Sequence, residues 1–227
     1  MNKKFLLVVF IILVLAGVGV YLFRKTTTGQ NRINLDDPNQ VFNITAPSDF
    51  DEYKKQRLEE KIMAAKDLYA AKKDDTWTWI VIGNMYEFAR DFDRAILAYE
   101  KTASLNQSEY ISITNLAYIY ENEKNDYAKA EEYYKKVVEL NGANPIQHTN
   151  LARLYEFKMN KLDEAEKVYL NGLEMTNNNP DLLVAVIRFY QRVDNAEKIT
   201  EYVTELLRLY PDNPVYQQDF ASLLKKT

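Results

Sequence analysis

The apolar positions along the chain follow two different patterns. Residues 5–23 form one uninterrupted run, FLLVVFIILVLAGVGVYLF, without a charged side chain. Beyond residue 49 the apolar residues instead recur three to four apart, which is the spacing of a helix with one buried face. The residues between, 26–48, are rich in Thr, Asn, Asp and Pro and show no apolar period. The pattern predicts an anchor, a flexible linker over residues 26–48 and an all-α domain.

The first run has the length of a membrane-spanning helix. At 1.5 Å per residue, residues 5–23 make a helix of roughly 28 Å, close to the hydrocarbon thickness of a bilayer. A cleaved signal peptide is the alternative, but its apolar region is usually about 7–15 residues long and ends in small residues. Here the basic residues Arg24 and Lys25 follow instead. We expect residues 1–25 to be a retained transmembrane signal-anchor.

The flanking charges set the expected orientation. Lys3 and Lys4 precede the run, and they nearly balance the basic pair that follows it. Because so short a tail is usually left in the cytoplasm, we expect the domain to lie outside it. A short lysine-flanked anchor before a domain without cysteine suits a bacterium. The expected location is therefore the bacterial inner or cell membrane, with the domain extracytoplasmic.

The second pattern is an internal repeat of 34 to 35 residues. Aromatic, apolar and small residues recur in phase, in these columns: Tyr86, Tyr120, Tyr155 and Tyr190; Tyr99, Tyr134, Tyr169 and Val203; and the pairs Gly83 with Ala95, Ala117 with Ala130 and Ala152 with Ala165. Within each repeat the spacing predicts two helices, and the small residues let those helices approach closely. A single hairpin of this kind cannot bury its own apolar face, so the repeats must stack.

The columns divide the domain into four repeats between two capping helices. The predicted boundaries are an N-terminal capping helix over 49–75, repeats over 76–109, 110–144, 145–179 and 180–213, and a C-terminal capping helix over 214–227. Asn-Pro pairs at Asn144, Asn179 and Asn213 mark helix starts, because proline suits the first turn of a helix.

Some positions depart from the period. Repeats two and three each carry one extra residue, which we place in the turns at 121–126 and 157–161. Repeat four has Ile187 and Ile199 where the other repeats have small residues. Its helices should therefore sit further apart, or it is a degenerate end repeat.

The repeat resembles the tetratricopeptide repeat (TPR) family. The resemblance rests on WIVIGNMY at 79–86, NLAYIY at 115–120 and NLARLY at 150–155, and it covers about two-thirds of the chain. It implies a superhelical solenoid of antiparallel helix pairs. It also implies that the first helix of each pair lines a concave groove that takes a peptide or a partner helix. By position, the partner-binding residues would be Trp77, Asn84, Phe88, Asn115, Tyr118, Arg153, Phe157 and Arg188.

One specialised TPR function does not fit these residues. Some TPR domains hold a terminal carboxylate with lysines and asparagines, and Asn84 and Asn115 match the asparagine positions. However, Ile80, Ile146 and Asn150 stand where the basic residues belong. Without those charges a carboxylate loses its main partners, so we reject the clamp.

Composition narrows the chemistry further. The chain has 29 basic and 33 acidic residues, a balance that argues against nucleic acid as a partner. It has no cysteine, and its single histidine, His148, falls in a packing column. Glu131 lies four residues before Lys135, the spacing of an ion pair on an exposed helix face. No motif of an enzyme, cofactor or metal site is present in the sequence.

The sequence therefore predicts a non-enzymatic protein without a cofactor. The favoured hypothesis is a membrane-anchored adaptor or assembly factor that binds a protein or peptide through the groove. The alternative is a self-associating structural scaffold at the membrane, formed as a homo-oligomer.

Overall fold

The computed structural model describes residues 33–225 of the chain, which divides into two compact parts, Met1–Ala46 and Pro47–Thr227. The described portion of the first part holds one helical turn, α2 (Pro38–Val41). The Asp37 carboxylate caps this turn by accepting a hydrogen bond of 2.9 Å from the backbone N–H of Asn39. The linker predicted over 26–48 thus includes one capped turn.

The anchor predicted at 5–23 lies outside the described residues. Within residues 33–225, none of the helices has the length and apolar character needed to cross a bilayer.

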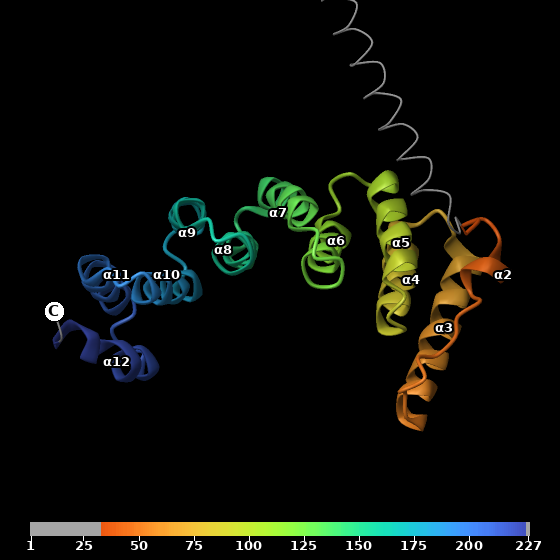
Figure 1. Ribbon diagram of the computed structural model, residues 1–227, viewed down its shortest axis with the longest axis horizontal. Helices are drawn as coiled ribbons and strands as arrows, with labels where there is room; N and C mark the ends of the chain where they lie inside the picture. Colours follow the sequence, from red (N-terminus) through yellow and green to blue (C-terminus); the bar gives the residue numbers. More distant parts are fainter. Residues whose placement is uncertain (1–32, 226–227) are drawn as a thin grey trace, which may run out of the picture. The chain divides into compact units, whose positions relative to one another are not determined.

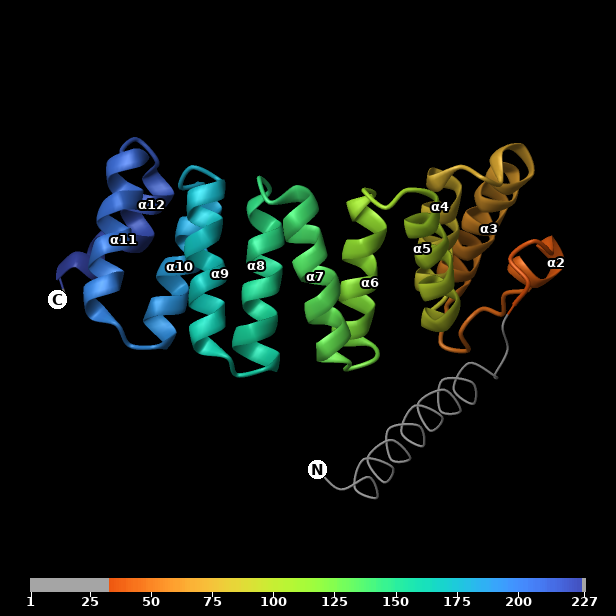
Figure 2. The ribbon, with the colours of Figure 1, turned by 90° about the horizontal axis from the view of Figure 1, so that it is seen from above.

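The second part is built from helices and, over residues 47–225, contains no strand. Its elements are α3 (Glu52–Lys72), α4 (Thr76–Phe88), α5 (Phe92–Leu105), α6 (Tyr110–Asn122), α7 (Tyr127–Asn141), α8 (Pro145–Arg153), the π-helix η1 (Leu154–Lys158), α9 (Leu162–Met175), α10 (Pro180–Arg192), α11 (Ala196–Leu209), α12 (Pro214–Phe220) and the 3₁₀ turn η2 (Ala221–Lys225). Helices pair in sequence order, and each pair packs on the next (Figure 1, Figure 2). The predicted all-α helical solenoid is confirmed.

The helix pairs are α4 with α5, α6 with α7, α8 and η1 with α9, and α10 with α11, here called repeats one to four. Both predicted tyrosine columns are buried, and so is Val203 in repeat four. In repeat one, a Cβ atom added at Gly83 would collide with the ring of Tyr99. The small residue in the first helix therefore lets a tyrosine of the second helix lie across it.

Helix ends follow the signals in the sequence. Asn144, Asn179 and Asn213 each cap a helix with the side chain, and proline fills the next position. Within each repeat, the residue before the N-cap of the second helix adopts a left-handed conformation: Arg90, Asn125, Asn160 and Asp194, with φ between 51° and 57°. Asn and Asp tolerate this region better than arginine does.

The extra residues of repeats two and three are accommodated differently. In repeat two the connection runs from 123 to 126, so the extra residue lies in the turn as predicted. In repeat three the prediction is wrong, because the connection is only 159–161 and the first helix continues through a π-helix at Leu154–Lys158. A π-helix fits one more residue into a helical turn, and such insertions are frequent at functional sites.

Bulky residues change the packing of repeat four. Ile187 is fully buried and Ile199 is partly buried. Bulky side chains therefore lie at positions of α10 and α11 where the other repeats have glycine or alanine.

Both ends of the stack are covered. At the N-terminal end α3 packs on α4, with the rings of Tyr69 and Trp79 edge to face at 5.9 Å. At the C-terminal end α12 and η2 pack on α11, and Phe220 is buried. The helix predicted over 214–227 is α-helical only to Phe220, after which it tightens into the 3₁₀ turn.

Candidate functional site

The first helices of repeats one to three, together with α3 and with Tyr134 of α7, line two adjoining hollows that we call the groove. The first hollow, of about 400 Å³, is lined by Lys61, Asn84, Glu87, Phe88 and Asn115. The second, of about 440 Å³, is lined by Glu87, Thr114, Asn115, Tyr118, Glu121, Asn122, Tyr134, Asn150 and Arg153. Glu87 and Asn115 belong to both hollows, so the groove is continuous from α3 to α8.

Most of the sequence-predicted binding residues lie in this groove. They are Asn84, Phe88, Asn115, Tyr118 and Arg153. Trp77, Phe157 and Arg188 line neither hollow. Trp77 and Phe157 are each 54% exposed, in the first turn of α4 and in the π-helix, and Arg188 is exposed on α10. The structure thus brings part of the predicted set together and leaves the rest at separate positions on the surface.

Three pairs of tyrosine and glutamate link the second helices to the groove face. The tyrosine hydroxyl reaches past the small residue of the first helix and lies within hydrogen-bond distance of a carboxylate: Tyr99 with Glu87 at 2.9 Å, Tyr134 with Glu121 at 2.8 Å, and Tyr169 with Glu156 at 3.4 Å. The Tyr99 hydroxyl also lies 2.7 Å from Asn84 Oδ1. Each carboxylate is therefore held in place by a tyrosine from the second helix of its repeat.

The tyrosines of these pairs remain proton donors at physiological pH. Burial, and after it the negative charge of the neighbouring glutamate, raises the pKa of Tyr99, Tyr134 and Tyr169 well above the usual value for a phenol. Because the hydroxyl keeps its proton, Tyr134 donates to Glu121 and Tyr169 to Glu156, whereas the single proton of Tyr99 is shared between Glu87 and Asn84 Oδ1. Each carboxylate keeps lone pairs for a further donor.

The glutamate of repeat three has such a further donor. Arg192, at the end of α10, binds Glu156 through both Nε and Nη2, with an Nη2–Oε2 distance of 2.9 Å. The same guanidinium lies 5.1 Å from the ring centroid of Phe157, and that of Arg153 lies 5.5 Å from it. Within residues 33–225, Glu87 and Glu121 form no ion pair of this kind.

Sequence reasoning missed the groove carboxylates Glu87 and Glu121 and the basic residue Lys61 of α3. A signal for the carboxylates exists, because Glu87, Glu121 and Glu156 are spaced by 34 and 35 residues like the tyrosines. The prediction used aromatic and small columns, which report packing. A charged residue that recurs at the same spacing as the tyrosines indicates that each repeat presents it on the same face of the domain.

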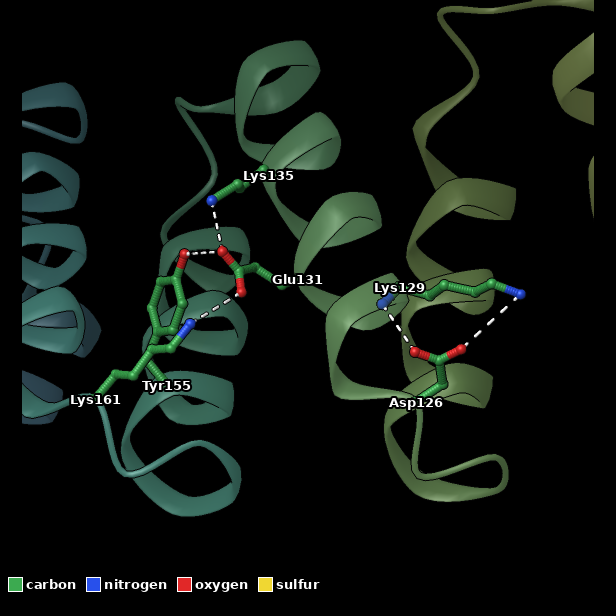
Figure 3. A network of polar contacts seen from close by, with 6 residues as sticks. All are labelled: Asp126, Lys129, Glu131, Lys135, Tyr155 and Lys161. Atoms are coloured by element: carbon green, nitrogen blue, oxygen red, sulfur yellow. Dashed lines mark hydrogen bonds and ion pairs between the residues drawn. The ribbon is translucent and has the colours of Figure 1, made fainter. Parts of the chain in front are cut away.

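Glu131 belongs to a different network, on the side where repeats two and three meet (Figure 3). Its predicted ion pair with Lys135 is present at 2.6 Å, but Glu131 also accepts hydrogen bonds from Tyr155 at 3.0 Å and Lys161 at 3.4 Å. Burial opposes ionisation of this carboxyl, but the hydrogen bonds from Lys135 and Tyr155 outweigh it and lower its pKa. The network therefore joins two repeats.

His148 is a packing residue, as predicted. It is buried, and its Nε2 lies 2.8 Å from the carbonyl oxygen of Gly142. The positions that would need basic residues for a carboxylate clamp are also unsuited to one. Ile80 is buried, Ile146 is exposed but apolar, and Asn150 is uncharged.

Comparison with known proteins identifies the repeats. Two family models described as tetratricopeptide repeat match residues 111–144 and 147–183. No curated protein matches the sequence. Solved structures with a similar fold include "MamA RS-1 ArsTM double mutant", at 15% identity and a TM-score of 0.53 over 82% of this chain and 99% of that chain.

Two further structures are similar. "Crystal structure of MamA" has 16% identity and a TM-score of 0.54, covering 69% of this chain and 91% of that chain. A thermophilic TPR protein of Thermus thermophilus, TTC0263, has 14% identity and a TM-score of 0.51, covering 76% of this chain and 93% of that chain. At these identities the likeness concerns the fold. The chain therefore contains tetratricopeptide repeats, assembled into an all-α solenoid.

Proposed function

We propose that this protein is a membrane-anchored adaptor or assembly factor whose groove binds a protein or peptide partner. The observation that carries the proposal is the groove itself, in which amides, an exposed tyrosine and two carboxylates that form no ion pair within residues 33–225 line one surface. Tetratricopeptide repeats typically act as interaction scaffolds and not as catalysts, which supports a non-enzymatic function.

Tyr118 and Arg153 are the side chains that we expect to contribute most to partner binding. Both line the groove and are exposed, Tyr118 to 48%. Tyrosine and arginine are enriched among the residues that dominate binding energies, because each combines a flat apolar surface with hydrogen-bond donors.

In-cell photo-crosslinking tests the proposal. A photoreactive amino acid is placed at Tyr118 or Arg153, and at Lys136, an exposed position on α7 outside the groove, as the control. We expect a heterologous protein crosslinked from the groove positions and absent from the Lys136 control. The same products from all three positions would contradict a groove-specific partner.

The proposal includes an anchor at residues 5–23 and an extracytoplasmic domain. Since the chain has no cysteine, Lys136→Cys creates a unique label. The protein should stay in the membrane pellet after carbonate extraction, and a membrane-impermeant maleimide should label it in intact cells. Extraction by carbonate would contradict the anchor, whereas labelling only after lysis would reverse the orientation.

A self-associating scaffold is the second candidate, and an apolar edge favours it. Trp77, Ile111 and Ile146 occupy the second position of the first helix in repeats one to three, and they are 54%, 41% and 60% exposed. Repeat four has Asp181 there. If this edge joins copies, the detergent-solubilised protein is an oligomer by light scattering, and Ile146→Asp makes it a monomer.

A further inference from the structure

The chain contains its own example of what the groove glutamates bind. In repeat three, Glu156 receives a two-point contact from the guanidinium of Arg192, and the ring of Phe157 lies against the same guanidinium. Arginine pairs well with carboxylates because its two parallel N–H donors match the two oxygens. This contact is made across the boundary between two repeats, from the last residue of α10 to the π-helix.

The equivalent cation is missing one and two repeats earlier. Arg192 is the last residue of the first helix in repeat four, and the residues 35 and 70 positions before it are Phe157 and Asn122. Neither side chain is charged. By this spacing, Phe157 is to Glu121, and Asn122 is to Glu87, what Arg192 is to Glu156, but neither supplies a guanidinium. The ion pairs of residues 33–225 include neither carboxylate.

We propose that the groove holds an arginine side chain of an extended partner peptide on Glu87 and Glu121. This inference rests on the proposed function and specifies the chemistry of the partner. Both carboxylates line the same hollow, which also contains the exposed ring of Tyr118, so a guanidinium can pair with carboxylates and stack on an aromatic face in one place.

The neighbouring side chains define how the peptide lies. Asn115 and Asn150 occupy the same position of successive repeats and offer amide groups to a peptide backbone. Arg153 lines the α8 end of the hollow, where its positive charge repels a cation. The partner arginine therefore lies toward α4, and an acidic residue of the peptide suits Arg153.

In the adjoining hollow, the Lys61 Nζ lies 5.2 Å from the ring centroid of Phe88, which leaves Tyr118 as the ring for the partner.

Binding of a small arginine derivative directly tests the proposed arginine site at Glu87 and Glu121. The probe is N-acetyl-arginine amide, and its uncharged isostere N-acetyl-citrulline amide is the control. Each is titrated into the full-length protein in a non-ionic detergent and followed by saturation-transfer NMR. We expect binding of the arginine probe, and binding about tenfold weaker in Glu87→Gln/Glu121→Gln. Glu132→Gln, on the exposed face of α7, should leave binding unchanged.

A second variant supplies an arginine to this site from the protein itself. Asn122→Arg places an arginine two repeats before Arg192, at the position that is equivalent by spacing and lines the same hollow as Glu87. We expect it to abolish binding of the probe while circular dichroism shows unchanged helix content. Equal binding of the citrulline probe, or undiminished binding of the arginine probe to either variant protein, would overturn the inference.

The crosslinking experiment separates this inference from the proposed function. If Glu87→Gln/Glu121→Gln leaves a groove-specific heterologous crosslink intact, the groove binds its partner by other contacts. The proposal that a partner arginine binds Glu87 and Glu121 is then wrong. If the arginine probe binds as expected but no partner crosslinks, the arginine site at Glu87 and Glu121 is supported and the adaptor function is contradicted.

Discussion

In repeat one the two helices pack across Gly83 and Ala95, whereas in repeat four they pack across Ile187 and Ile199. The difference extends to two further positions. Where repeat one has Tyr99 bonded to Glu87, repeat four has Val203 and Gln191. The helical hairpin is the same in both, yet only one of them presents a carboxylate held by a tyrosine.

The three differences have one physical cause. A tyrosine of the second helix can reach the groove only by crossing the first helix, and it can cross only where the first helix has a small residue. In repeat four the buried side chain of Ile187 fills the space that the tyrosine ring would cross. The second helix therefore has the shorter Val203, and the groove has Gln191 in place of a carboxylate bonded to tyrosine. The chemistry of the groove thus depends on packing between the helices beneath it.

The largest expected effect comes from emptying the core of repeat four. Ile187→Ala removes a fully buried side chain, and the cavity should cost about 2–5 kcal/mol of unfolding free energy in denaturant titration. Adding Val203→Tyr should recover part of this loss, because the ring can enter the space as Tyr99 does beside Gly83. Strictly additive effects of the two changes would contradict the link between small residue and tyrosine.

The reverse change in repeat three should be somewhat smaller. Ala152→Leu inserts a bulky side chain where α8 faces α9, and overpacking should cost about 1–3 kcal/mol of unfolding free energy. The same substitution at Ala128, which is exposed on α7, serves as the control and should be nearly neutral. A neutral result at Ala152 as well would mean that the helices of repeat three do not meet there.

Removing one hydroxyl tests the tyrosine–glutamate pair alone. Tyr134→Phe keeps the ring but deletes the donor to Glu121, and it should cost about 1–2 kcal/mol in the same titration. Tyr110→Phe, at a tyrosine that is 38% exposed, should cost almost nothing. Equal effects of the two changes would show that the hydrogen bond does not stabilise the repeat.

The smallest expected effect concerns the contact between repeats two and three. The folded-state pKa of Glu131 is lowered below its ordinary value of 4.5, so its contribution to stability is present above about pH 4.5 and is lost as pH falls through the folded pKa. Glu131→Gln should therefore lower the unfolding free energy at pH 7 by less than about 1 kcal/mol in denaturant titration, and the difference should shrink toward pH 3. Glu132→Gln, at an exposed position of the same helix, is the control, and an equal loss of unfolding free energy at pH 7 in the two variants would contradict the contact.

The sequence was most informative where one residue type recurs for one physical reason. The tyrosine columns and the Asn-Pro helix starts placed the repeats, because burial and capping each act through positions fixed within the repeat. The extra residue of repeat three was misplaced, since a turn and a π-helix can absorb an insertion equally well at the level of spacing. The pairing of Arg192 with Glu156 could not be predicted from spacing, because it depends on how two repeats stack.

The order of the stack also has a mechanical consequence. In the described residues from 47 onward, each repeat packs mainly on its immediate neighbours, and the chain passes through the repeats in the same order. A tension applied between the two ends of this domain would pass through every repeat interface in series. The weakest interface would yield first while the others stayed folded, so the domain should lengthen in steps under load.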